Sequence, residues 1–141
     1  MVNQNKFHIL QKECSNCIKC SLSLTRNNVV FGRGNPSSKL FVIGEGPGQQ
    51  EDEQGLAFVG RAGKMLDSAF LSVGIDTNED CYISNIVKCR PPNNRKPLAN
   101  EVIECMPWLN KQIQMVQPKV IVLAGSTAVQ SYLNIDEPIS K

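Results

Sequence analysis

Several features are scarce in these 141 residues. There is one histidine, His8, and the net charge is only +2. A chain so close to neutral gives no argument for nucleic-acid binding from bulk charge, so any basic surface must be local. No run of about 18 apolar residues is present, so we expect no membrane segment. Residues 1–10 lack the basic region and apolar stretch of a signal peptide, so we expect a cytoplasmic protein.

Cysteine, in contrast, is plentiful. The six cysteines are Cys14, Cys17, Cys20, Cys81, Cys89 and Cys105. In a reducing compartment such residues are more often metal ligands, cluster ligands or core residues than disulfides. The first three are each separated by two residues, so two different Cys-x-x-Cys pairs are open. On the residues alone, a structural zinc site and an iron–sulfur cluster are equally compatible with four thiolate ligands.

Apolar runs alternate with helical patterns along the chain. Buried strands are predicted at 40–43, 81–87 and 119–124, and a short strand at 29–31. Helices are predicted at 64–73, 101–116 and 127–133, with a short helix within 1–13 and a loop over 90–97. Gly74 is expected to cap the first of these helices and Asn100 the second, which Pro107 would kink. The alternation predicts a single α/β domain over 1–141, with three α/β/α layers and a central parallel sheet.

The stretch from Leu40 to Asp67 carries the densest set of functional signals. Its strand is followed by glycines 44, 46 and 48, which let a ligand approach backbone N–H groups at the carboxyl end of a central strand. An acidic run containing Glu51 comes next, then the lone aromatic Phe58 and a second glycine pair at 60 and 63. A phosphate-binding loop is disfavoured, because GEGPG is neither G-x-G-x-x-G nor a Walker sequence.

This ordered series resembles the family 4 uracil-DNA glycosylases, the iron–sulfur type. The matching motifs are GEGPG at 44–48, Glu51-Asp52, FVGRAG at 58–63, YISNIVKCRPPNNRKP at 82–97, CIKC at 17–20 and TRNNVVFGRGNP at 25–36. The resemblance runs from about Cys17 to the end of the sequence. The His-Pro-Ser motif that the family carries near its C-terminus is absent from these residues. The resemblance therefore implies a glycosylase-like domain that is C-terminally incomplete.

The function that the resemblance implies is base-excision repair. Such a protein flips uracil out of DNA and releases it by hydrolysis, with uracil-containing DNA as its partner and a monomer as its expected state. The missing motif leaves an alternative, a truncated and catalytically impaired iron–sulfur module that binds DNA or uracil. A test of base release separates the two.

Roles for individual residues follow from the same resemblance. Phe58 would stack on the flipped base. Asn85 would read it, because a carboxamide can donate to uracil O4 and accept from N3–H, whereas cytosine presents the opposite pattern. The loop Gly44, Glu45 and Gly46 would contact the base. Glu45 and Glu51 are the candidate catalytic carboxylates.

The resemblance also selects the cluster ligands. Counting back from Thr25-Arg26 in the family pattern selects Cys17 and Cys20, and the other two ligands correspond to Cys89 and Cys105. We therefore expect these four thiolates to hold a [4Fe–4S] cluster with a structural role. Cys14 is expected to be a bystander or a substitute ligand, and Cys81 a small core residue.

Overall fold

A four-stranded sheet forms the centre of the protein, which a computed structural model describes over residues 4–134. The strand order is β1-β3-β2-β4. β2 (Leu40–Gly44) lies between β3 (Cys81–Asn85) and β4 (Val120–Leu123) and is parallel to both. β1 (Arg33–Gly34) pairs with β3 in the antiparallel direction. The predicted parallel sheet is confirmed for three strands, and the fourth makes the sheet mixed.

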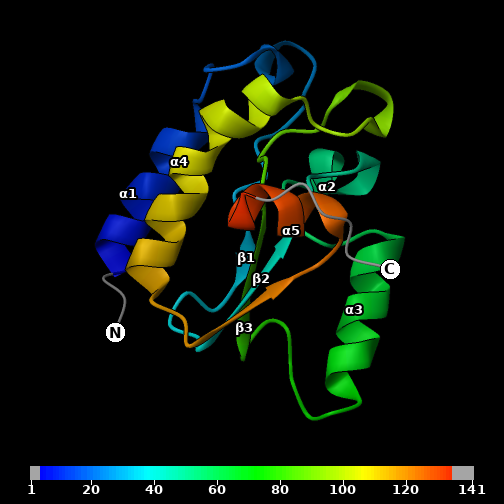
Figure 1. Cartoon of the computed structure of the whole chain (residues 1–141). Coiled ribbons are helices and arrows are strands. Elements are labelled where there is room, and N and C mark those ends of the chain that lie inside the picture. Colours follow the sequence, from blue (N-terminus) through cyan, green and yellow to red (C-terminus); the bar gives the residue numbers. More distant parts are fainter. Residues whose placement is uncertain (1–3, 135–141) are drawn as a thin grey trace.

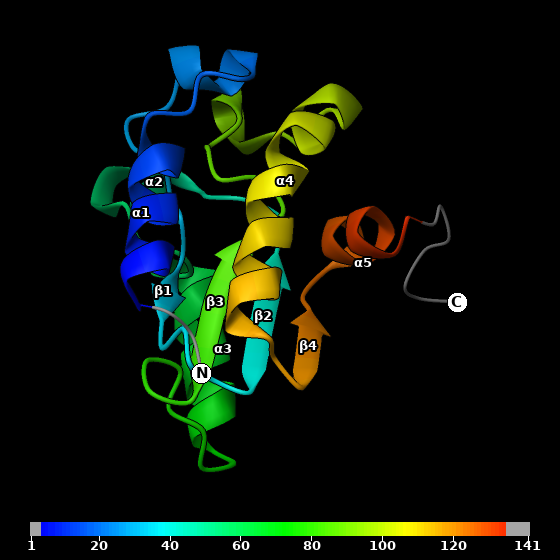
Figure 2. The ribbon, with the colours of Figure 1, turned by 90° about the vertical axis from the view of Figure 1, so that its left-hand side faces the viewer.

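Helices cover both faces of this sheet (Figures 1 and 2). α1 (Gln4–Ser15) and α4 (Ala99–Val116) lie side by side over one face, and α3 (Arg61–Leu71) covers the other. α2 (Gln49–Gln54) follows the glycine loop, α5 (Ser126–Leu133) follows β4, and two short 3-10 turns span Ser21–Leu24 and Pro92–Asn94. The expected three-layer α/β/α arrangement is therefore present. None of the helices within residues 4–134 has the length and apolar character needed to span a bilayer.

The alternation of side chains along β2 divides the core into two clusters. Phe41 and Ile43 pack with Tyr82 and the inner residues of α1 and α4. Val42 points to the other face and packs with Ile83 and the apolar side of α3. Both clusters follow from the period-2 geometry of a strand that is buried on both faces.

Several predicted elements differ from the structure. The strand expected at 29–31 is wrong: Val30 and Phe31 are apolar because each is buried in one of the two clusters, and the strand begins only at Arg33. β4, expected to be fully buried, is an edge strand whose side chains are all partly or largely exposed.

The helix boundaries also need correction. α2 was not predicted; it begins where the Glu51 carboxylate accepts the Gly48 N–H, a side-chain cap of its first turn. α4 begins two residues before the expected start, with Leu98 rather than Asn100 at its cap, and continues through Pro107. α3 ends at Leu71, so Gly74 lies in the following turn, where its φ of +82° suits glycine.

Candidate functional site

A pocket opens at the carboxyl ends of the two central strands. Gly44 closes β2 and Asn85 closes β3, and the two residues are partners in the parallel register. The pocket is lined by Gly46, Gly48, Glu51, Phe58, Gly60, Arg61, Ala62, Gly63 and Asn85. Three signals that are separate in the sequence, the glycine loop, the aromatic residue and the asparagine, are therefore brought to one place. This is the edge at which parallel α/β sheets bind their ligands.

Gly44 lies beneath the two side chains that the sequence singled out. A Cβ at Gly44 would lie 2.4 Å from Phe58 Cζ and 2.7 Å from Asn85 Oδ1. Among the hydrogen bonds of residues 4–134, Asn85 takes part only through its backbone, so its carboxamide is available to a ligand. The pocket therefore presents an aromatic ring and a free amide group side by side.

Glu51 lines the pocket, but its carboxylate is engaged. The Gly48 N–H donates to Oε1 at 2.9 Å, while Val59 and Gly60 donate to Oε2 at 3.0 and 2.7 Å. One carboxylate thus ties the glycine loop to the segment that follows Phe58. This contact gives Glu51 a clear structural task at the pocket wall.

Glu45 is directed away from the pocket. Its carboxylate accepts a hydrogen bond from the Thr127 hydroxyl in the first turn of α5, and its carbonyl accepts from Val87 N. Glu45 is not among the residues that line the pocket. The structure therefore separates the two candidate carboxylates: Glu51 is at the pocket and Glu45 joins β2 to α5.

A second pocket gathers cysteines from three parts of the chain. It is lined by Cys14, Cys17, Cys20, Cys89 and Cys105, together with Lys19, Leu22, Arg26, Val29, Lys88, Glu104 and Trp108. All four expected ligands are therefore present, and Cys14 joins them. Cys81 is buried in the other core cluster, as expected for a core residue.

The surroundings of these thiols suit metal-bound sulfur. Three N–H groups donate to sulfur atoms: Arg26 Nη1 to Cys89 at 3.3 Å, Trp108 Nε1 to Cys17 at 3.3 Å, and the backbone of Lys88 to Cys105 at 3.2 Å. Hydrogen bonds to sulfur are a regular feature of iron–sulfur sites. Burial raises the pKa of the Cys14 thiol to about 12 and that of Cys105 to about 11. Both thiols therefore stay protonated at neutral pH unless a metal binds.

The residues around this pocket offer a soft donor set. Five thiols line it, and N–H groups donate to three of the sulfur atoms. Thiolate ligands suit both a structural zinc ion and an iron–sulfur cluster. Within residues 4–134, no three His, Cys, Asp or Glu side chains are already placed to hold a metal ion.

Lys88 connects the two pockets. Its side chain is fully buried, and Nζ donates to Ser84 Oγ at 2.6 Å and to the Asn85 carbonyl at 2.7 Å. Burial lowers the pKa of Lys88 to about 8, against the opposing effect of the neighbouring Cys105, Cys14 and Cys89 thiols. An ammonium in this position would compensate the negative charge of metal-bound thiolates, and its hydrogen bond to the Asn85 carbonyl fixes the backbone that carries Asn85.

Sequence reasoning missed Lys88 and Thr127 as partners of the residues at these sites. Lys88 directly precedes a predicted cluster ligand, so its position carried a signal. Thr127, the partner of Glu45 on α5, carried no such signal, because a threonine in the first turn of a helix is ordinary.

Comparison with known proteins agrees with this geometry. The family model described as "Uracil DNA glycosylase superfamily" matches residues 31–140. A type-4 uracil-DNA glycosylase of Thermotoga maritima is 44% identical over 126 residues, which is 89% of this chain and 65% of the relative. The type-4 enzyme of Archaeoglobus fulgidus is 44% identical over 124 residues, 88% of this chain and 62% of the relative.

The match to the Sulfurisphaera tokodaii type-4 enzyme is 41% identical over 116 residues and includes 82% of this chain and 53% of the relative. The chain thus spans between about half and two thirds of the length of these curated relatives. The match to the family model extends over most of the chain and includes the whole of the first pocket. The chain belongs to the uracil DNA glycosylase superfamily.

Proposed function

We propose that residues 1–141 form a single uracil-DNA glycosylase-like domain that takes a uracil nucleotide out of DNA and hydrolyses its glycosidic bond. The observation that carries this proposal is the pairing of Phe58 and a free Asn85 carboxamide over Gly44, in a pocket at the ends of parallel strands. The names of the type-4 relatives support the same reaction. The proposed partner is uracil-containing DNA, bound by a monomer.

Recognition of the base follows from the two side chains. The ring of Phe58 offers a stacking surface worth about 1–3 kcal/mol per base. The Asn85 carboxamide can donate to O4 and accept from N3–H of uracil. Cytosine has a donor where uracil has O4, so the same amide orientation leaves a donor facing a donor. A base that is already unpaired costs least to extrude, which favours uracil in single strands or mismatches.

The carboxylates take different parts in this proposal. Glu51 lies at the pocket wall, where its negative charge favours the positive charge that develops on the sugar as the bond breaks. Its hydrogen bonds to three N–H groups argue against the removal of a proton from water by this residue. Glu45 holds α5 against the end of β2 and would act on the base only through the position of the loop.

We further propose that Cys17, Cys20, Cys89 and Cys105 hold a [4Fe–4S] cluster, with Cys14 as the remaining thiol of that pocket. Hydrolysis of a glycosidic bond needs no electron transfer, so the cluster would supply a cross-link rather than redox chemistry. It would join the segment after α1 to the loop after β3 and to α4. Arg26 supports the same junction, since it donates to both Cys89 Sγ and the Cys17 carbonyl.

A second candidate is a module that binds uracil or DNA without efficient turnover. The engaged carboxylate of Glu51 favours it, because the described pocket then holds a base reader and a stacking ring but no free general base. The two candidates predict the same binding and different rates.

The test uses a single-stranded oligonucleotide with one uracil, and matched strands with thymine or cytosine at that position. Release of the base is measured at one fixed salt concentration for the wild type, Phe58→Ala and Asn85→Ala. Release from the uracil strand alone, lost in both variants, supports the glycosylase. Selective binding of the uracil strand with no release supports the binding module, and equal binding of all three strands refutes both.

A further inference from the structure

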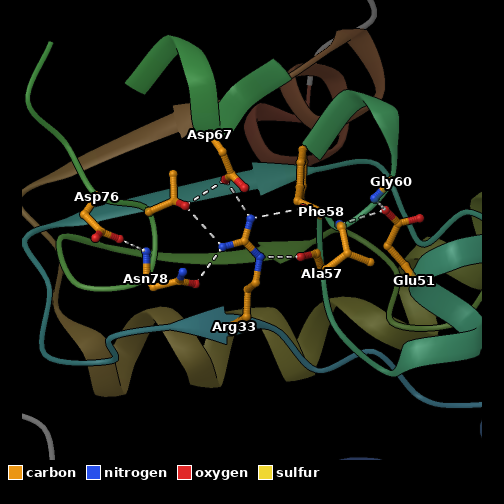
Figure 3. A network of polar contacts seen from close by, with 10 residues as sticks. Arg33, Glu51, Ala57, Phe58, Gly60, Asp67, Asp76 and Asn78 are labelled. Carbon is orange, nitrogen blue, oxygen red and sulfur yellow. Dashed lines mark hydrogen bonds and ion pairs between the residues drawn. The ribbon is translucent and has the colours of Figure 1, made fainter. Parts of the chain in front are cut away.

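One guanidinium group lies directly beneath the proposed stacking residue (Figure 3). Arg33 Nε donates to the Ala57 carbonyl at 2.6 Å, and Nη2 donates to the Phe58 carbonyl at 3.0 Å. Two successive carbonyls of the segment that carries the ring are therefore held by one side chain. The Arg33 side chain is only 9% exposed, so these bonds are shielded from water.

The other side of the same guanidinium is anchored to α3 and to the loop that follows it. Nη2 donates to Asp67 Oδ1 at 2.9 Å, and Nη1 donates to Thr77 Oγ1 at 3.2 Å and Asn78 Oδ1 at 3.0 Å. Thr77 in turn donates to Asp67 Oδ1 at 2.7 Å. All five N–H groups of Arg33 are used, which fixes the plane of the guanidinium.

Phe58 needs such support because its backbone is strained. Its φ is +55°, in the left-handed region that a bulky side chain seldom adopts. Gly63 makes room for it, since a Cβ at Gly63 would lie 1.9 Å from the Phe58 carbonyl oxygen. A strained conformation of this kind persists only where its surroundings hold it. Without the bonds from Arg33, the segment would relax and the ring would leave its place over Gly44.

Arg33 also ties the ring to the strand that carries Asn85. Arg33 is paired with Ile83 across β1 and β3, two residues before Asn85. Gly32 and Gly34 allow this close approach, because a Cβ on Gly32 would lie 2.8 Å from the Ile83 carbonyl oxygen and one on Gly34 would lie 2.3 Å from the Cys81 carbonyl oxygen. β3 therefore fixes the positions of both groups. It carries Asn85 itself, and it holds Phe58 through its pairing with Arg33.

From this geometry we propose that Arg33 is a positioning residue for base recognition. It holds Phe58 in the left-handed conformation, and so sets the ring at the height that lets a flipped pyrimidine stack while it meets Asn85. That the ligand is a uracil base rests on the proposed function, whereas the contact by which Arg33 holds Phe58 does not.

The test variant is Arg33→Lys, which removes the planar guanidinium group with its five N–H donors but keeps the positive charge. The matched control is Arg95→Lys, which breaks the two hydrogen bonds of another bidentate arginine–carboxylate pair, to Glu101, in a different part of the fold. Backbone chemical shifts and proton couplings of Phe58 are measured by NMR in both variants. Free uracil is then titrated into the wild type, both variants, Phe58→Ala and the double variant Arg33→Lys/Phe58→Ala. Thr77→Val, which removes one anchor and keeps the shape, serves if Arg33→Lys does not fold.

In Arg33→Lys we expect Phe58 to leave the left-handed region and uracil affinity to fall about tenfold or more, with no change in Arg95→Lys. The double variant should bind no more weakly than Phe58→Ala, because Arg33 acts through the ring. The proposal would be overturned if the losses of uracil affinity in Arg33→Lys and Phe58→Ala added up in the double variant. It would also be overturned if Phe58 kept its wild-type couplings in Arg33→Lys. If the wild type does not bind uracil, the proposed function fails, and the couplings of Phe58 still decide the role of Arg33.

Discussion

The ring of Phe58 and the carboxamide of Asn85 meet over Gly44, with no space for a side chain between them and the strand. A single methyl group at that position would collide with Phe58 Cζ and Asn85 Oδ1 at 2.4 and 2.7 Å. The glycine is therefore required by the site and not by its backbone angle, since Gly44 is not among the glycines with positive φ.

Gly44→Ala should displace both side chains. We expect a loss of stability of about 1–3 kcal/mol, as for other overpacked positions, and a loss of most uracil binding. The measurement is denaturant unfolding together with uracil titration. Gly74→Ala is the control: nothing lies within 4 Å of that Cβ, so only the backbone strain at φ +82° should appear, with uracil binding unchanged. Equal binding by Gly44→Ala and the wild type would remove this pocket from base recognition.

Asn85→Asp should change which base the pocket prefers. A carboxylate cannot donate to uracil O4, but it can accept from the N4 amino group of cytosine. We expect uracil to lose about 1–3 kcal/mol of binding free energy relative to cytosine. Asn85→Ala should weaken both bases without reversing their order. Competition between matched oligonucleotides measures the difference, and an unchanged ratio in Asn85→Asp would show that Asn85 does not read the base.

Glu51→Gln separates a structural role from a catalytic one. Glutamine keeps the shape, but its NH₂ group cannot accept from a backbone N–H, so at least one of the N–H groups of Gly48, Val59 and Gly60 loses its partner. We expect a loss of stability of about 1–3 kcal/mol. Loss of the negative charge should also lower the rate of base release, whereas a residue that acts only as a general base would lose activity at unchanged stability. Thermal unfolding and single-turnover release rates, measured on the same samples, distinguish the two results.

The cysteine pocket predicts the metal content of the protein. Protein purified without oxygen should be brown and hold about four irons per chain. Cys89→Ser and Cys105→Ser should lose the colour, whereas Cys81→Ser, in the other core cluster, should keep it. Comparison of Cys14→Ser with Cys20→Ser identifies which of the two is the fourth ligand, beside Cys17, Cys89 and Cys105. One zinc per chain with no iron would contradict the cluster.

The start of α4 predicts a pH dependence. Hydrogen bonds from Arg95, and one from the Leu98 N–H, lower the pKa of the buried Glu101 below its ordinary value of 4.5. A carboxylate with a lowered pKa stabilises the fold above the unfolded value, and this contribution is lost as the pH falls through the folded value. The stability difference between the wild type and Glu101→Gln should therefore be constant above about pH 5 and shrink below 4.5. Glu79→Gln, at an exposed position, is the control and should show no such change.

The central strands and the pocket could be predicted because their signals are local. Continuous apolar residues marked β2 and β3, and the glycines after β2 marked the edge where ligands bind. The grouping of Cys17, Cys20, Cys89 and Cys105 needed the family resemblance, because spacing alone left two frames open for the first pair. The structure places all four, with Cys14, around one pocket.

The failures have a common physical origin in long-range contacts. The neighbours Glu51 and Asp52 are alike in sequence, yet Glu51 binds the loop around Phe58, and the buried Asp52 accepts hydrogen bonds from Asn27 and Asn28. The position of Glu45 depends on Thr127, which is 82 residues away. No local pattern separates these three carboxylates, because their partners come from other segments.

The distribution of the cysteines has a consequence for the order of folding. Cys17 and Cys105 are 88 positions apart, and the whole of β2, α3 and β3 lies between them. Closing so long a loop costs entropy that a few sulfur–metal bonds must offset in an unfolded chain. α1, which ends just before Cys17, and α4, which carries Cys105, pack against each other and against β2, so formation of this layer brings the two ends of the loop together without a bond to metal. The proposed cofactor would therefore enter a chain whose sheet has already formed, and would slow its unfolding more than it speeds its folding.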